Sequence, residues 1–130
     1  MQLESNQATT QKSQQEVFDF LNNVENFEQL MPSSIQKFEK ISDVRFLFQL
    51  KGMPEIVLEK KESHAPNKIV LGAASEKLPF TLTADIKEDS PTSSTTKLNF
   101  EGQFNAMMGM MIKSPIQNFI NTLGENISKL

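Results

Sequence analysis

Apolar residues near the amino end recur every three or four positions, at Val17, Phe20, Leu21 and Val24. This spacing is typical of a helix with one buried face. The run Ser13-Gln14-Gln15-Glu16 matches a capping box, in which the first side chain and the last satisfy each other's free backbone amides. The pattern predicts a helix from Gln14, a break at Asn22-Asn23, and a second short helix that ends before Pro32.

From residue 34 onward the period changes to two, which is typical of antiparallel strands with one buried face. Turn-forming residues divide this region into six strands. Phe38 is out of phase with Ile35 and Ile41, which predicts a bulge. The polar run from Ser90 to Thr96 is predicted to be a hairpin loop. Residues 3–10 are weakly patterned and are predicted to form an edge strand.

The chain closes with a long helical pattern over residues 105–130. Pro115 interrupts it, but Ser114-Pro115-Ile116-Gln117 resembles a new capping box with proline in the first turn, which predicts a kink. The long helix is the one segment long enough to cover the apolar sheet face. The predicted class is therefore α+β, with a seven-stranded curved antiparallel sheet wrapped on the C-terminal helix and two short helices between its first two strands.

Composition restricts the function further. With 38% apolar and 22% charged residues, the 130-residue chain has the composition of one globular domain. The absence of cysteine excludes thiol chemistry and cysteine-based metal sites. A net charge of -3 has the wrong sign for nucleic acid, which we do not expect as a partner. No stretch resembles a signal peptide or a membrane span, so we expect a soluble cytoplasmic protein without integral membrane association.

The order of elements and three local sequences resemble the START-like superfamily, also called SRPBCC, with its helix-grip fold. These are the helix at residues 16–21, the segment Asn26-Phe27-Glu28-Gln29-Leu30-Met31-Pro32, and the junction from Gly102 into a helix that contains Pro115-Ile116. The resemblance covers residues 1–130 as one domain and implies a hydrophobic internal cavity. Its members include lipid and sterol carriers, quinone-binding proteins, polyketide cyclases and dehydratases, and co-chaperones, so it implies no single function.

Candidate catalytic groups are few. The inward registers of the predicted strands hold no ionisable residue, and Asp85 and Glu101 are expected to face outward. Only Lys60 or a residue of the irregular strand at 35–41 could supply an ionisable group inside the cavity. His64 is the single histidine and lies in a predicted turn, where a solvated role is expected. We therefore expect no catalytic residue, no metal site and no cofactor, although the resemblance keeps a cyclase-like or dehydratase-like enzyme open.

The richest local feature is Met107-Met108-Gly109-Met110-Met111, since flexible thioethers adapt to varied apolar partners. Met108 and Met111 are expected to face the sheet, either as core filler or as cavity lining, with Gly109 as a hinge if the segment is a gate. In the helix-grip topology four connections meet at one apolar end: the segment after Met31, the turns at 52–54 and 78–79, and the junction at 105–107. We interpret this end as a cavity mouth, the alternative being that these residues plug that end of the core. The predicted ligand-binding residues are Phe46, Phe48, Met53, Leu58, Leu71, Leu78, Leu82, Phe100, Met107, Met108, Met111 and Ile112.

The sequence thus favours a non-enzymatic protein that binds a hydrophobic or amphipathic small molecule between the sheet and the last helix. An enzyme is the first alternative. The second is a protein-interaction module that uses the methionine-rich segment and Met53, including a homodimer.

Overall fold

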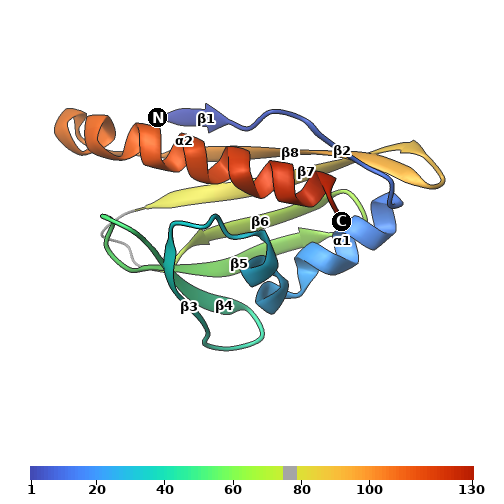
Figure 1. Cartoon of the computed structure of the whole chain (residues 1–130), viewed down its shortest axis with the longest axis horizontal. Helices are drawn as coiled ribbons and strands as arrows, with labels where there is room; N and C mark the ends of the chain where they lie inside the picture. Colours follow the sequence, from blue (N-terminus) through green and yellow to red (C-terminus); the bar gives the residue numbers. More distant parts are fainter. Residues whose placement is uncertain (75–78) are drawn as a thin grey trace.

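The computed structural model describes residues 1–74 and 79–130. Its strands are β1 (Gln2–Glu4), β2 (Ala8–Thr10), β3 (Ile35–Lys40), β4 (Arg45–Leu50), β5 (Ile56–His64), β6 (Lys68–Ala73), β7 (Phe80–Ser90) and β8 (Ser93–Gly102). Its helices are α1 (Gln14–Asn22), the 3-10 helix η1 (Val24–Leu30) and α2 (Ala106–Ser128). The predicted α+β order of strand, two short helices, meander and long helix is confirmed (Figure 1).

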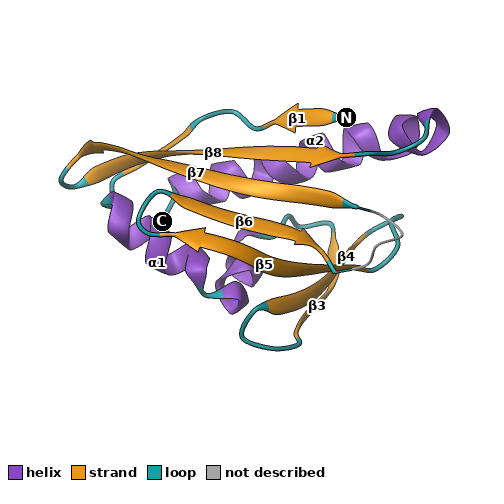
Figure 2. Ribbon diagram, turned by 180° about the vertical axis from the view of Figure 1, so that it is seen from behind, coloured by secondary structure: helices purple, strands orange, loops and turns teal. Residues whose placement is uncertain are grey.

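All the strands belong to one antiparallel sheet with the order β1-β8-β7-β6-β5-β4-β3, in which β2 also pairs with β8. Seen from behind, the sheet lies in front of all the helices, so the helices cover one face and leave the other open (Figure 2). Because only one face is covered, each strand carries one apolar register and one polar register. Phe46, Leu58, Leu82 and Phe100, on four different strands, are all at most 3% exposed.

The start of α1 agrees with the sequence prediction. The Glu16 backbone amide donates to the Ser13 hydroxyl over 3.1 Å, and the Ser13 amide donates to the Glu16 carboxylate over 3.2 Å. This reciprocal pair satisfies two amides that a helix start otherwise leaves free. The predicted second helix is present as η1, a 3-10 helix, whose buried Val24, Phe27 and Leu30 recur every three residues, as that tighter geometry requires.

The amino-terminal edge strand is divided into two. Both β1 and β2 pair with β8, and they are separated at Ser5, whose buried hydroxyl accepts from the Leu98 amide over 2.9 Å. The Ser5 hydroxyl thus accepts the hydrogen bond that a backbone carbonyl would accept in a regular strand pair. The expected bulge near Phe38 is confirmed, since the register of β3 on β4 shifts between Ile35 and Lys37.

The hairpin predicted at Ser90 to Thr96 is present, but its loop is shorter than predicted. β7 runs to Ser90 and β8 begins at Ser93, so most of this polar run is strand. Residues 93–96 pair with β7 on one side and, from Ser94, with β2 on the other, and the Ser94 hydroxyl donates to the Lys12 carbonyl over 2.9 Å. Pairing with two neighbouring strands outweighs the turn preference of the serine-rich run.

The kink expected at Ser114-Pro115 stays a prediction, and the last helix is continuous across this pair. One helix runs from Ala106 to Ser128 with Pro115 inside it. Its carboxy-terminal half is fixed by packing, because Ile116, Phe119, Ile120, Leu123 and Ile127 are all at most 5% exposed against the sheet and the short helices. This burial offsets the amide hydrogen bond that the proline removes.

Candidate ligand-binding groove

An apolar groove opens between the first half of α2 and the end of the sheet near the β4–β5 turn, with a volume of about 320 Å³. Its lining comes from three places: the turn and the start of β5, the aromatic residues at the ends of β7 and β8, and one face of α2. The lining residues are Lys51, Gly52, Met53, Pro54, Ile56, Phe80, Phe100, Phe104, Met108, Met111, Ile112, Pro115 and Ile116. Lys51 is the only charged residue among these described residues.

The floor of the groove consists of three phenylalanine rings. The ring centroids of Phe80 and Phe100 are 5.1 Å apart, and those of Phe100 and Phe104 are 6.2 Å apart. Gly102 makes this arrangement possible, because a Cβ there would overlap the Phe104 ring and lie 3.0 Å from the Phe80 Cβ. The floor is thus an apolar, aromatic surface whose shape depends on the absence of a side chain at Gly102.

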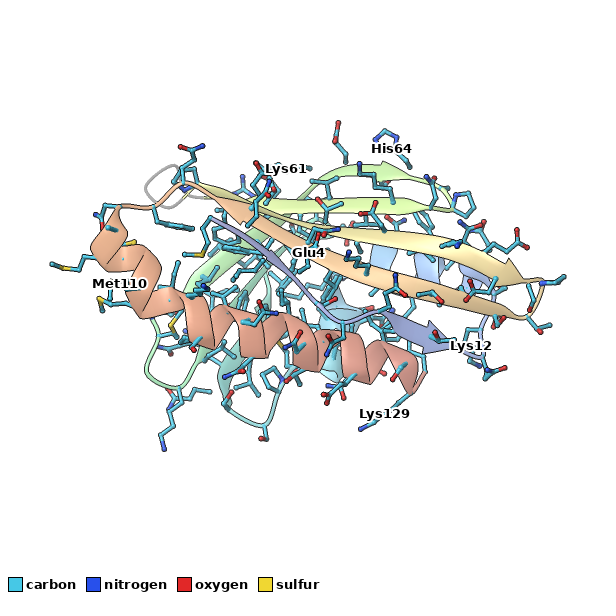
Figure 3. The ribbon with its side chains drawn as sticks, turned by 90° about the horizontal axis from the view of Figure 1, so that it is seen from above. Glu4, Lys12, Lys61, His64, Met110 and Lys129 are labelled. Atoms are coloured by element: carbon cyan, nitrogen blue, oxygen red, sulfur yellow. The ribbon has the colours of Figure 1, made fainter. Side chains whose placement is uncertain are left out.

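The first turns of α2 form the roof. Asn105 caps this helix, since its side-chain oxygen accepts from the Met108 amide over 2.8 Å. Met108 and Met111 line the groove although they are 36% and 71% exposed, whereas Met107 and Met110 are 76% and 83% exposed and lie outside it. Figure 3 shows Met110 pointing away from the ribbon at the opposite end of the molecule from His64.

The β4–β5 turn forms the third wall. Gly52 has a φ of 82°, which side-chain-bearing residues rarely adopt, and the Met53 amide donates to the Leu50 carbonyl over 3.0 Å. The Gln49 side chain then donates to the Met53 carbonyl over 3.1 Å. These contacts fix the turn so that Met53 lies against the groove.

A second groove, of about 350 Å³, lies on the other side of Met53. Lys51, Met53 and Pro115 line both grooves. The rest of its lining is mixed, with four uncharged polar side chains among apolar ones: Pro32, Ser34, Leu50, Ser114, Asn118, Phe119 and Thr122. The two grooves, which differ in the polarity of their lining, therefore meet at Lys51, Met53 and Pro115.

The structure distributes the predicted site residues between two environments. Met53, Phe100, Met108, Met111 and Ile112 line the apolar groove. The side chains of Phe46, Phe48, Leu58, Leu71 and Leu82 are at most 3% exposed in the core. Beneath the carboxy-terminal turns of α2, the hollow lined by Leu71, Leu82 and Leu123 has a volume of only about 10 Å³. Met107 lies outside the groove, and Leu78 lies outside the described residues.

Eight lining residues were absent from the prediction, and three of them, Ile56, Phe80 and Phe104, belong to the sheet end of the groove; the other five are Lys51, Gly52, Pro54, Pro115 and Ile116. Ile56 and Phe80 occupy inward positions at the sheet end where the apolar turns gather, and Phe104 follows Gly102 at that same end. Their position at the apolar end of the sheet could have identified them as lining residues, because the hollow lies at that end and not under the centre of the sheet.

Apart from Lys51, the ionisable groups in the described part of the chain lie outside the apolar groove. The Lys60 ammonium donates to the Asn22 backbone carbonyl and side-chain oxygen over 3.1 and 3.0 Å. Glu59 faces outward between two cations: its hydrogen bond to Lys61, and then that to Arg45, holds its pKa below the ordinary range of a glutamate. Within residues 1–74 and 79–130, no cluster of three histidine, cysteine or acidic side chains has metal-binding geometry.

A scan against protein-family models finds no match, and a comparison with curated protein sequences finds no significant one. Solved structures do match. A point mutant of norcoclaurine synthase from Thalictrum flavum, in complex with a transition-state analogue, superposes with a TM-score of 0.76 at 11% identity, covering 99% of this chain and 92% of that one. A protein from Thermus thermophilus gives 0.74 at 9% identity, covering 99% and 95%.

A START superfamily protein from Mycobacterium smegmatis gives a TM-score of 0.71 at 8% identity, covering 98% of this chain and 94% of that one. The chain therefore has the helix-grip fold of the SRPBCC and Bet v1-like proteins, as its sequence indicated. This fold typically holds a ligand-binding cavity. Among the described helices, none has the length and hydropathy needed to cross a membrane.

Proposed function

We propose that this protein binds an apolar or amphipathic small molecule in the groove between α2 and the β4–β5 turn. The observation that carries the proposal is the groove itself: apart from Lys51 and Gly52, every described lining residue has an apolar side chain. Burial of apolar ligand surface contributes roughly 25 cal/mol per Å² before the costs of association, so such a wall favours an apolar ligand.

The size of the groove restricts the ligand. A volume of about 320 Å³ is near the lower end of the range for small-molecule sites, roughly 300–1,000 Å³. It suits a single ring system or a short alkyl chain better than a two-chain lipid. Because the wall consists of flexible methionines and flat phenylalanines, we expect modest selectivity among apolar ligands.

The proposal is non-enzymatic. Norcoclaurine synthase is an enzyme, but its likeness to this chain is one of fold at 11% identity. Acid-base chemistry would need a titratable group beside the ligand. Among the described lining residues the only such group is the exposed Lys51. We therefore propose no enzymatic function for this groove.

The test uses the fluorescence of N-phenyl-1-naphthylamine, a neutral apolar probe, titrated with the purified protein. Ile112→Lys places a charge on the groove wall, and the matched control Met110→Lys places the same charge two residues away on the exposed side of α2. We expect saturable binding to the wild type and to Met110→Lys, and at least a tenfold loss in Ile112→Lys. Equal binding by both variants, or no binding by the wild type, would overturn the proposal. Circular dichroism checks that both variants are folded.

A further inference from the structure

We propose that the second groove receives the head group of an amphipathic ligand whose apolar part occupies the first groove, and that Lys51 selects a head group with negative charge. This inference rests on the proposed function. It adds a ligand class: a short alkyl or ring compound that carries a carboxylate, sulfate or phosphate.

The first argument is continuity. Met53 and Pro115 line both grooves, so the two hollows are neighbours across one pair of side chains. Met53 is half-buried and unbranched, and a methionine side chain changes rotamer at little cost. A ligand can therefore pass over or beside this thioether and occupy both hollows.

The second argument is polarity. The apolar groove offers a ligand almost no hydrogen-bonding side chain. The second groove offers the side chains of Ser34, Ser114, Asn118 and Thr122. None of the four takes part in a side-chain hydrogen bond that the structure shows within residues 1–74 and 79–130. Hydroxyl and amide groups of this kind can donate to the oxygen atoms of an anionic head group.

The third argument is charge. Lys51 lines both grooves and is the one charged side chain among the described residues of either. The sequence from Gly102 to Gly124, which includes the whole groove-lining part of α2, contains no acidic residue. Glu55, close to the turn, forms an ion pair with Lys37 over 3.2 Å. An anionic head group in either groove would therefore meet the positive charge of Lys51 and no negative charge among the described lining residues.

The expected effect is moderate, because Lys51 is exposed and an exposed ion pair is screened by water and salt. We expect an anionic head group to strengthen binding about three- to tenfold over a neutral one of the same chain length. This preference should decrease as the salt concentration rises.

The experiment measures displacement of N-phenyl-1-naphthylamine by dodecan-1-ol, dodecanoate, dodecyl phosphate and dodecyltrimethylammonium, all below their micelle concentrations, at pH 7.5 and low salt. The wild type should bind the two anions more tightly than the alcohol, and the cation most weakly. Lys51→Met keeps the apolar stem and removes the charge, and should abolish the difference between anions and alcohol. The matched control Lys113→Met removes a charge from α2 outside both grooves and should retain the difference.

A second pair of variants tests the hydrogen-bonding side chains of the second groove. Asn118→Leu and Thr122→Val remove hydrogen-bonding groups from it and leave the lining of the apolar groove unchanged. They should weaken dodecyl phosphate severalfold and leave dodecan-1-ol unaffected. If all four compounds bind with equal affinity, or if Lys51→Met keeps the anion preference, this inference fails while the proposed function stands. If none displaces the probe and the probe itself does not bind, the proposed function fails.

Discussion

The rings of Phe48 and Phe119 stack face to face, with centroids 4.9 Å apart and planes 8° from parallel. Phe48 belongs to β4 and Phe119 to α2, so this contact joins the sheet to the long helix. Both rings are at most 4% exposed. Phe119 also lines the second groove, so the packed core lies directly behind the proposed head-group site.

Phe119→Ala should lower the free energy of unfolding by about 3–5 kcal/mol, because a buried ring is lost and a cavity remains. Urea denaturation followed by circular dichroism measures this loss. Phe119→Leu should cost less, since it fills part of the space, and the exposed neighbour Asn118→Ala should change stability by less than about 0.5 kcal/mol. A loss below about 1 kcal/mol in Phe119→Ala would contradict the packing described here.

Gly102→Ala should damage the floor of the apolar groove. The added methyl group would overlap the Phe104 ring and press on Phe80. Displacement of the ring should cost about 1–3 kcal/mol of stability and weaken binding of N-phenyl-1-naphthylamine, because the ring then enters the groove. Gly109→Ala, on α2, is the comparison: its Cβ would meet only the end of the flexible Met1 side chain, at 3.2 Å, and binding should persist.

Glu59→Gln should make stability less dependent on acidic pH. Lys61 and Arg45 favour the charged carboxylate and lower its pKa in the folded protein. A lowered pKa contributes stability that is complete above the unfolded value, about 4.3 for glutamate, and is lost as the pH falls through the folded value. The difference between wild type and Glu59→Gln should therefore be largest near neutral pH and disappear in strong acid.

Thermal unfolding from pH 7 to pH 2.5 measures that difference. Glu62→Gln, on the same strand, is the control, because Glu62 forms no ion pair among the described residues. A constant difference between wild type and Glu59→Gln over the whole range would show that the ion pairs do not influence the carboxyl group.

Met107→Ser with Met110→Ser should leave the free energy of unfolding within about 0.5 kcal/mol of the wild type, since both side chains are largely exposed. The alternative of a homodimer through this segment makes a separate prediction. The wild type would then associate with increasing concentration in sedimentation experiments, and the double variant would sediment as a monomer. A wild type that stays monomeric at high concentration would contradict the homodimer.

The helix-grip architecture was predictable because its signals are local and regular. The capping box at Ser13 fixes the start of α1, and the two-residue period fixes which face of each strand is buried. The loop at Ser90 to Thr96 was predicted too long, because one of the two strands that pair with its second half, β2, is more than eighty residues away in the sequence. A pairing at that separation leaves no trace in a local pattern.

The position of the hollow was only partly predictable. Periodicity shows that Phe46 and Leu58 point inward, but whether inward means packed core or open groove depends on how side-chain volumes fill the space. The centre is filled and the end near Met53 is open. Lys51 was not among the predicted site residues, because its place at the junction of two grooves depends on the turn geometry at Gly52.

Pro115 separates two parts of α2 that have different contacts, and this has a consequence for how the protein can change. The residues that anchor the helix follow the proline, from Ile116 to Ile127, whereas the methionines that roof the apolar hollow precede it. Amino-acid replacements among these methionines can therefore change the wall of the apolar groove without removing the contacts that keep the helix packed, so that this wall and thermodynamic robustness can evolve along separate stretches of a single helix.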